Sequence, residues 1–154
     1  MKKTALIITA LLSLFSVNSY SEEIGEVSTT FKLIGANNKI VIDAFDDPDI
    51  AGITCYVSRA KTGGIKGSVG LAEDPSEASI ACRQTGAIDE SKLDKLKDGE
   101  QVFKANLSLV FKTLQVVRFY DKKRKTVVYL SYSDKIIDGS PKNSISAVSI
   151  AKFN

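Results

Sequence analysis

ITCYVSRAKTGGIKGSVGLAEDPSEASIACRQ, residues 53–84, holds both cysteines of the chain, Cys55 and Cys82. Residues alternate between apolar and polar at each end of this stretch, which is typical of half-buried strands. Cys55 falls on the same strand face as its apolar second neighbours, and Cys82 on the same face as Ile80. Both thiols are therefore predicted to face the core, with a glycine-rich basic loop between the two strands.

The chain begins with the pattern of an export signal. Lys2 and Lys3 precede an uncharged, largely apolar run over residues 5–17, and Ser19-Tyr20-Ser21 has the small-x-small form of a cleavage site. The apolar run is shorter than the roughly 20 residues that cross a bilayer. We expect cleavage after Ser21, a signal peptide over residues 1–21 and a single mature domain over residues 22–154.

Two cysteines in an exported protein predict one disulfide, which would stabilise this fold by roughly 3–4 kcal/mol. A redox-active pair is the alternative. It would normally show a Cys-x-x-Cys spacing or a neighbouring histidine, and this chain has neither. The pattern favours a structural bridge between Cys55 and Cys82.

The remaining alternation predicts a β-rich fold. Strands are expected over residues 24–34, 39–45, 126–133 and 144–150, with one bulged strand or two strands over residues 102–120. The strands at 24–34 and 39–45 are predicted to form a hairpin, with the first strand half-buried and with Ile40 and Ile42 on one face of the second. On the strand at 126–133, Val128, Leu130 and Tyr132 share one face. One short helix is expected over residues 89–97, capped by Ser91 with Asp94 and ended by Gly99. We predict a mainly β, single-domain antiparallel sandwich or partly open barrel with one short helix.

Composition excludes several classes of chemistry. The chain has 21 basic residues, 18 acidic residues and no histidine. Two of the lysines belong to the predicted signal, so the mature chain is almost neutral, and neither nucleic acid nor a membrane is predicted as a partner. Histidine-dependent triads and zinc sites are excluded, and no nucleotide-binding motif is present. No cofactor and no membrane span are predicted for the mature protein.

The glycine-rich loop is the best candidate for a binding site. Backbone N–H groups in such a loop, next to lysines, can form an anion-binding nest. The alternative is a crossover loop whose glycines only satisfy turn geometry. The candidate ligand-binding residues are Arg59, Lys61, Gly63, Gly64, Lys66 and Gly67.

Aspartates offer a second hypothesis. Asp46, Asp47 and Asp49 cluster after an expected strand, and Asp74 lies in the loop. Such carboxylates can hold a hard cation or act as acid and base in an enzyme without histidine. The alternative is a turn stabilised by side-chain hydrogen bonds.

A basic run, Lys122-Lys123-Arg124-Lys125, is predicted at the tip of a hairpin. It could contact an anionic envelope component or an acidic partner. The alternative is a solvated turn.

Six strings, in the same order, resemble the CreA family of small exported proteins of Gram-negative bacteria: EEIGEVSTTFKLIG (22–35), VIDAFDDPDI (41–50), ITCYVSRAKTGGIKG (53–67), GLAEDPSEASIAC (70–82), SLVFKTLQVVRFYD (108–121) and YSDKIIDGSPKNSISAV (132–148). The resemblance implies a periplasmic location and supports the disulfide and the single domain. It implies no catalytic residue. We therefore expect a monomeric, non-catalytic binding or interaction module for an anionic ligand or an envelope protein, with the aspartate-based enzyme as the alternative.

Overall fold

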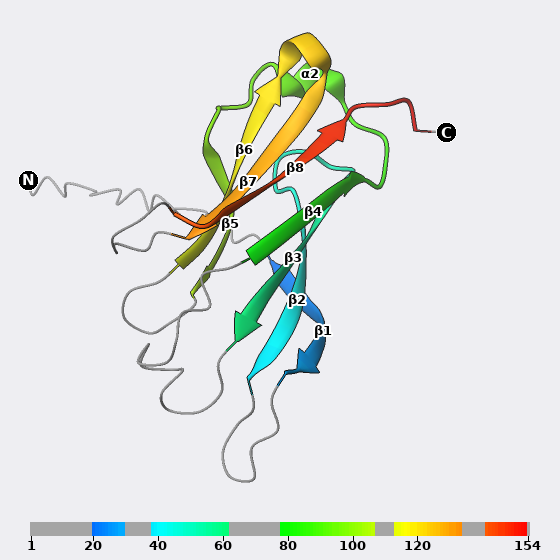
Figure 1. The fold of residues 1–154 in the computed structure, drawn as a ribbon. Helices are drawn as coiled ribbons and strands as arrows, with labels where there is room; N and C mark the ends of the chain where they lie inside the picture. Colours follow the sequence, from blue (N-terminus) through cyan, green and yellow to red (C-terminus); the bar gives the residue numbers. More distant parts are fainter. Residues whose placement is uncertain (1–19, 30–37, 62–77, 107–112, 134–140, 154) are drawn as a thin grey trace, which may run out of the picture.

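The computed structural model describes residues 20–29, 38–61, 78–106, 113–133 and 141–153 (Figure 1). Short strands follow one another along these ranges, with one short helix and one 3₁₀ turn. In chain order the elements are β1 (Ser21–Ser28), β2 (Lys39–Asp46), β3 (Ile53–Lys61), β4 (Ala78–Gln84), α2 (Glu90–Leu93), β5 (Glu100–Asn106), β6 (Thr113–Asp121), the 3₁₀ turn η1 (Lys122–Arg124), β7 (Thr126–Ser133) and β8 (Asn143–Ser149).

The strands form two four-stranded antiparallel sheets, and each sheet follows the order of the chain. Sheet A has the order β1-β2-β3-β4, and sheet B has the order β5-β6-β7-β8. Each strand therefore pairs with its neighbour in sequence, which is the simplest way to join antiparallel strands. The prediction of a mainly β, antiparallel fold with one short helix is confirmed, and the described strands form no closed barrel.

The two sheets meet where β4 lies beside β8 (Figure 1). The backbone N–H of Cys82 donates to the Ser146 hydroxyl at 2.8 Å. Further along the two strands, the Gln84 amide donates to the Ala151 carbonyl at 2.9 Å and accepts from the Ala151 N–H at 3.0 Å. Side-chain groups thus satisfy backbone groups at this seam, where a polar group left unpaired would be costly.

The core lies between the inner faces of the sheets. Phe45 of β2 stacks on Phe103 of β5, with ring centroids 4.7 Å apart, and this contact joins sheet A to sheet B. Both rings are almost completely buried. Aromatic pairs of this kind add stabilisation beyond the area that they bury. The buried cluster also includes Ile50, Ile53, Cys55, Val57, Ile80, Leu93, Val102, Leu114, Val116, Val127, Tyr129 and Val148.

The first hairpin is present, but its burial differs from the prediction of a half-buried first strand. β1 pairs with β2 as expected, yet the Val27 side chain is 65% exposed and Ile24 is 52% exposed. The reason is position, because β1 is the outermost strand of sheet A and Figure 1 shows it away from sheet B. Ile40 and Ile42 share a face of β2 as predicted, but that face is the outer one.

The helix is shorter than predicted and is capped by another residue. It spans only Glu90–Leu93, and Asp89 is its N-cap. The Asp89 carboxylate accepts from the Ser91 N–H and from the Ser91 hydroxyl, so Ser91 is a donor within the first turn and caps nothing. Aspartate caps as well as serine does, and this explains the two-residue error. Leu93 is buried in the hydrophobic core and so attaches the helix to it. Gly99, which was expected to end the helix, lies six residues beyond Leu93, the last helical residue.

The C-terminal third confirms the second hairpin. Residues 102–120 contribute two paired strands, β5 and β6, with a register shift between Gln101 and Phe103, and residues 107–112 lie outside the described ranges. β6 pairs with β7 from Leu114 opposite Ser133 to Asp121 opposite Thr126. η1 forms the tip of this hairpin, as expected for the basic run.

Gly52, in the turn between β2 and β3, has a backbone conformation that few other residues adopt. Its φ is +93°, and its carbonyl accepts from the N–H groups of Thr85 at 2.8 Å and Gly86 at 3.3 Å. A Cβ at this position would lie 2.8 Å from the Gly86 carbonyl oxygen and 2.9 Å from that of Ala87. Gly52 therefore allows the segment after β4 to approach the turn closely.

We predict that Gly52→Ala lowers the free energy of unfolding by about 2 kcal/mol or more, because the methyl group both strains the backbone and clashes with two carbonyls. Urea unfolding of the mature protein measures the loss. The control is Gly25→Ala, where a Cβ would meet no atom within 4 Å. An equal effect of the two substitutions would contradict the prediction.

Candidate functional site

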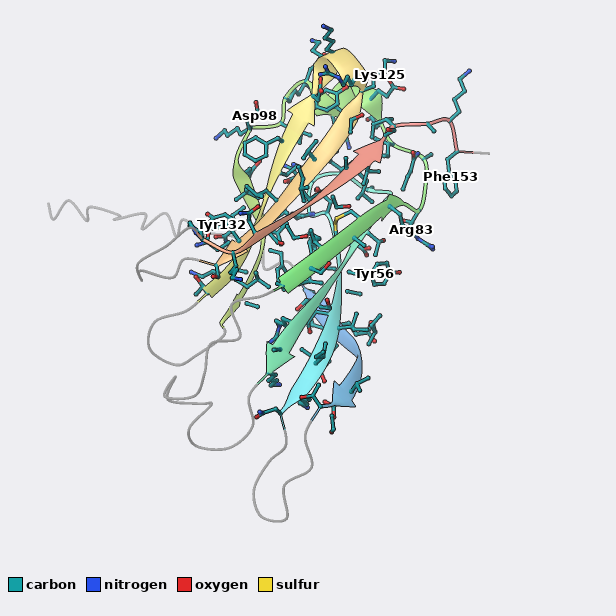
Figure 2. The ribbon with its side chains drawn as sticks, in the orientation of Figure 1. Tyr56, Arg83, Asp98, Lys125, Tyr132 and Phe153 are labelled. Carbon is teal, nitrogen blue, oxygen red and sulfur yellow. A yellow bond between two sulfur atoms is a disulfide. The ribbon has the colours of Figure 1, made fainter. Side chains whose placement is uncertain are left out.

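The disulfide predicted from the sequence is present between Cys55 and Cys82 (Figure 2). The two residues are direct partners in the antiparallel register of β3 and β4, and their Cα atoms are 4.0 Å apart. Cys55 is fully buried and Cys82 is half-buried, so both face inward as expected. The bridge fixes the two strands between which the glycine-rich loop is inserted.

A pocket of about 500 Å³ lies at the ends of β3 and β4 that flank this loop. Its described walls come from four strands and from the residue before β8. They are Ile40 of β2, Ser58, Arg59 and Ala60 of β3, Ala78 and Ser79 of β4, and Lys142, Asn143 and Ser144 at the start of β8. The pocket therefore lies where sheet A meets the beginning of the last strand of sheet B.

Arg59, one of the predicted ligand-binding residues, lines this pocket. Its Nε donates to Asp43 Oδ2 at 2.8 Å, and the two side chains are 13% and 7% exposed. Both belong to the inner face of sheet A, on neighbouring strands. The ion pair holds the guanidinium in one orientation and compensates part of its charge.

The other predicted binding residues separate into two groups. Lys61, the last residue of β3, is half exposed, and its Nζ lies 3.9 Å from Glu23 Oε2 of β1. Exposed pairs of this kind contribute little to stability. Gly63, Gly64, Lys66 and Gly67 lie outside the described residues, so the anion-binding nest stays a prediction.

A second cluster lies at the opposite end of β2 and β3, around Arg118 of β6. The Arg118 side chain is fully buried, and its Nη1 donates to Asp47 Oδ1 at 2.5 Å. Its Nη2 donates to Asp49 Oδ2 at 2.9 Å and to Glu100 Oε2 at 3.0 Å. One guanidinium from sheet B thus binds the turn that follows β2 in sheet A, a geometry for which arginine is better suited than lysine.

Asp47 uses both carboxylate oxygens in this cluster. Oδ1 also accepts from the N–H groups of Asp49 and Ile50, each at 2.9 Å. Oδ2 accepts from the Tyr129 hydroxyl at 2.6 Å. The interpretation of this aspartate as a turn-forming residue is confirmed, and its partnership with Arg118 and Tyr129 was not predicted.

The charge of Arg118 is firmly held. Burial alone would lower the pKa of Arg118, but the hydrogen bonds and the attraction of Asp47 and Asp49 outweigh it and raise that pKa above its ordinary value. The cluster is therefore a permanent buried ion pair, whose attraction must offset the cost of removing both charges from water. The sequence does indicate that Arg118 faces inward, because it alternates with the apolar residues Leu114 and Val116 on one strand face, but it does not indicate its partners.

Comparison with known proteins assigns the chain to a family. The family model for the CreA protein matches residues 24–153. The chain belongs to the CreA family. Proteins named Protein CreA from Escherichia coli K12 and from the O6:H1 and O157:H7 strains are each 57% identical to it over 154 residues, covering 97% of both chains. No solved structure matches. The resemblance seen in the sequence is thereby confirmed.

The basic run of this CreA-family chain forms ion pairs with nearby acidic residues at the hairpin tip, where Figure 2 labels Lys125. The three described ion pairs join Lys122 to Asp94 at 3.0 Å, Arg124 to Asp121 at 2.8 Å, and Lys125 to Glu90 at 3.0 Å. These side chains are largely exposed, as in a solvated turn.

The described ranges contain no helix that is long and apolar enough to span a membrane. Nor do the described Asp, Glu and Cys residues form any group of three or more that could hold a metal ion.

Tyr129 gives a measurable signature of the Arg118 cluster. Burial, and then the adjacent Asp47 carboxylate, raise the pKa of Tyr129 well above its ordinary value of 10.0. Tyr129→Phe removes one hydrogen bond to a charged acceptor, so we expect a loss of about 1.5–3 kcal/mol of unfolding free energy at neutral pH. Urea unfolding measures the loss. Tyr132→Phe, which removes a 3.3 Å bond to Gln115, is the control and should lose less.

The same variant predicts a pH dependence. Above about pH 10 the unfolded tyrosine loses its proton while the folded one keeps it, so stability falls as pH rises. The stability advantage of wild type over Tyr129→Phe should therefore shrink by roughly 1.4 kcal/mol per pH unit above that point. An advantage that stays constant from about pH 9 to 11 would contradict the assignment.

Proposed function

We propose that this CreA-family protein is exported to the periplasm, loses residues 1–21, and acts there as a single-domain, monomeric binding module without catalytic activity. The leader pattern supports export, and the disulfide suits an oxidising compartment. The relatives from Escherichia coli agree with a Gram-negative envelope. The binding site is the pocket at the ends of β3 and β4.

The observation that carries this proposal is the separation of the pocket from the carboxylates. The pocket contains Arg59 and Lys142 and, among its described walls, no acidic residue. Asp47 and Asp49, by contrast, are bound to Arg118 at the other end of β2 and β3. A pocket with convergent polar groups is the usual place for a ligand.

The enzyme alternative loses one of its aspartates to this arrangement. Asp47 is completely buried with four donors, whereas Asp46, which accepts from the Thr54 hydroxyl at 2.6 Å, and Asp49, whose side chain is 44% exposed, reach the surface. A general base must reach a substrate proton, which a fully occupied carboxylate does not. Asp74 lies outside the described residues.

The test has two arms. Cell fractionation with mass measurement of the mature N-terminus is expected to place a chain beginning at Glu22 in the periplasmic fraction. Thermal unfolding of that purified chain is expected to shift upward with the low-molecular-weight fraction of a periplasmic extract, because a ligand of the native state stabilises it. Size-exclusion chromatography with light scattering should give the monomer mass. A cytoplasmic chain, or no shift with any such fraction, would contradict the proposal.

A further inference from the structure

The outer face of sheet B carries an apolar patch. Residues on adjacent strands lie directly opposite one another in the register, so this face consists of rows that run across β6, β7 and β8. The two central rows are apolar, and we call them the sheet B patch: Val117, Leu130 and Ile145 form one row, and Phe119, Val128 and Ala147 form the other. A polar row lies on each side, with Tyr132 in one of them and Thr126 in the other.

The side chains of the patch point away from sheet A. Their neighbours along the strands point inward, since Arg118 binds Asp47 and the Ser146 hydroxyl accepts from the Cys82 N–H. Ile145 is 66% exposed and Phe119 is 38% exposed, so the described part of the chain leaves both open to a partner. The outer face of an antiparallel sheet is usually polar, and a contiguous apolar patch with a polar rim usually marks a contact surface.

The free edges of the two sheets are poorer contact surfaces than this face. β1 and β5 are the outermost strands, and each has a register shift, between Glu23 and Gly25 in β1 and between Gln101 and Phe103 in β5. A bulge bends an edge strand and interrupts its row of N–H and C=O groups, which discourages pairing with another chain. The outer face of sheet B therefore offers the better surface for a partner.

Charges of opposite sign lie beside the two ends of the patch. Lys104 of β5 is exposed and lies opposite Gln115, in the polar row that contains Tyr132. Asp98 is also exposed, and its carboxylate accepts from the Tyr120 N–H near the other polar row. Figure 2 shows Asp98 toward the hairpin tip and Tyr132 toward the opposite end of sheet B. The face is therefore positive beside one end and negative beside the other.

We propose that the sheet B patch is a self-association surface, through which two copies of this chain form a weak symmetric dimer. A two-fold axis that runs between the apolar rows lays each row on the other row of the second copy, as in two sheets packed face to face. The bulky Ile145 of one copy then lies over the small Ala147 of the other. The same axis brings Lys104 of each copy to the end that carries Asp98 in the other, so the face complements itself in both shape and charge.

The size of this face sets the strength of the dimer. With ordinary spacings between strands and residues, the outer face of four strands offers roughly 500 Å² per copy. A standard stable interface buries about 800 Å² per partner, so we expect a dissociation constant of about 0.1–1 mM. The inference goes beyond the proposed function, and the monomer of that proposal remains the state of the protein at micromolar concentration.

The test follows the mature protein through concentrations below and above the expected dissociation constant. Sedimentation equilibrium should show the mass rising from that of a monomer toward that of a dimer. In NMR spectra of the isotope-labelled protein, the backbone amides of the six patch residues should shift together along the same concentration curve.

Two charge variants test whether the partner is a second copy. Lys104→Glu and Asp98→Lys should each weaken self-association at least about fivefold, because each places like charges together twice in the symmetric dimer. An equimolar mixture of the two variants should recover association, because every contact between unlike copies again joins opposite charges. Recovery on mixing would not occur if a substitution had merely damaged the fold.

A pair of isoleucines tests the apolar part of the contact. Ile145→Thr should weaken self-association at least about fivefold, since the symmetric dimer loses two apolar contacts. Ile42→Thr is the matched control, because Ile42 is an exposed isoleucine on the outer face of sheet A, and it should leave self-association unchanged.

The inference is overturned if the mass stays that of a monomer at every concentration, if the shifts fall on other amides, or if the mixed charge variants associate no better than each variant alone. Equal effects of Ile145→Thr and Ile42→Thr would also overturn it. None of these outcomes bears on the proposed function, which is tested by location, by the mass at micromolar concentration and by stabilisation with periplasmic extract.

Discussion

Arg118→Met is expected to lower the free energy of unfolding by about 3–5 kcal/mol, the largest effect of any substitution considered for this fold. Methionine fills a similar volume but leaves the completely buried Asp47 without its cationic partner. An uncompensated buried charge costs far more than a lost surface contact. Urea unfolding at neutral pH, followed by circular dichroism, measures the loss.

The matched control is Arg124→Met at the hairpin tip, whose pair with Asp121 is largely exposed. It should change stability by no more than about 1 kcal/mol. The double variant Asp47→Leu with Arg118→Met separates the cost of an orphaned charge from that of the pair itself. It should be more stable than Arg118→Met alone, since replacing both charges by apolar groups removes the unpaired one. A loss below about 1 kcal/mol for Arg118→Met would show that the cluster does not hold the sheets together.

Removing the disulfide with Cys55→Ala and Cys82→Ala together is expected to cost roughly 3–4 kcal/mol. The bridge closes a loop with a sequence separation of 27 residues, so its loss increases the entropy of the unfolded chain. The two alanines also leave less apolar volume in the core beside Val57. Thermal and urea unfolding of the oxidised wild type and the double variant measure the difference.

Reduction supplies the internal control for this experiment. Wild type in a phosphine reductant should lose most of the same stability, while the double variant should not respond to the reductant. Equal stability of oxidised and reduced wild type would contradict a structural role for the bridge.

Predictions from the sequence were strongest where a local pattern has one physical meaning. The Cys55–Cys82 pair could be predicted because two inward-facing cysteines in an exported chain leave few alternatives. The β6–β7 hairpin could be predicted because a polar turn separates two alternating runs. Both predictions rest on local sequence patterns, which a single sequence shows directly.

Predictions were weaker where burial depends on what covers a face. On β7, Val128, Leu130 and Tyr132 do share a face, but the fully buried face carries Val127 and Tyr129 with two serines, Ser131 and Ser133. Both faces contain apolar residues, so alternation alone does not show which one meets the other sheet. On β2, too, alternation does not show which face is buried. Ile42 is partly exposed, whereas the charged Asp43 is buried and paired with Arg59.

The residues of the candidate site, too, were predicted only in part. Arg59 was predicted from its place beside the loop, but Lys142 was not, because its position depends on β8 lying beside β4 across a long stretch of sequence. The Arg118 cluster was missed for a similar reason, since Arg118 and Asp47 are 71 positions apart in the sequence. Contacts between the two sheets are tertiary, and a single sequence offers no direct signal for them.

Hydrogen–deuterium exchange of the mature protein tests most directly whether the ligand binds at the pocket or at the carboxylates. Exchange is compared with and without the low-molecular-weight fraction of a periplasmic extract. Binding at the pocket predicts slower exchange in peptides that contain Ser58–Lys61, Ser79 or Asn143–Ser144, with no change at Asp46–Ile50. Protection confined to Asp46–Ile50 would contradict the proposed function and favour chemistry at the aspartates.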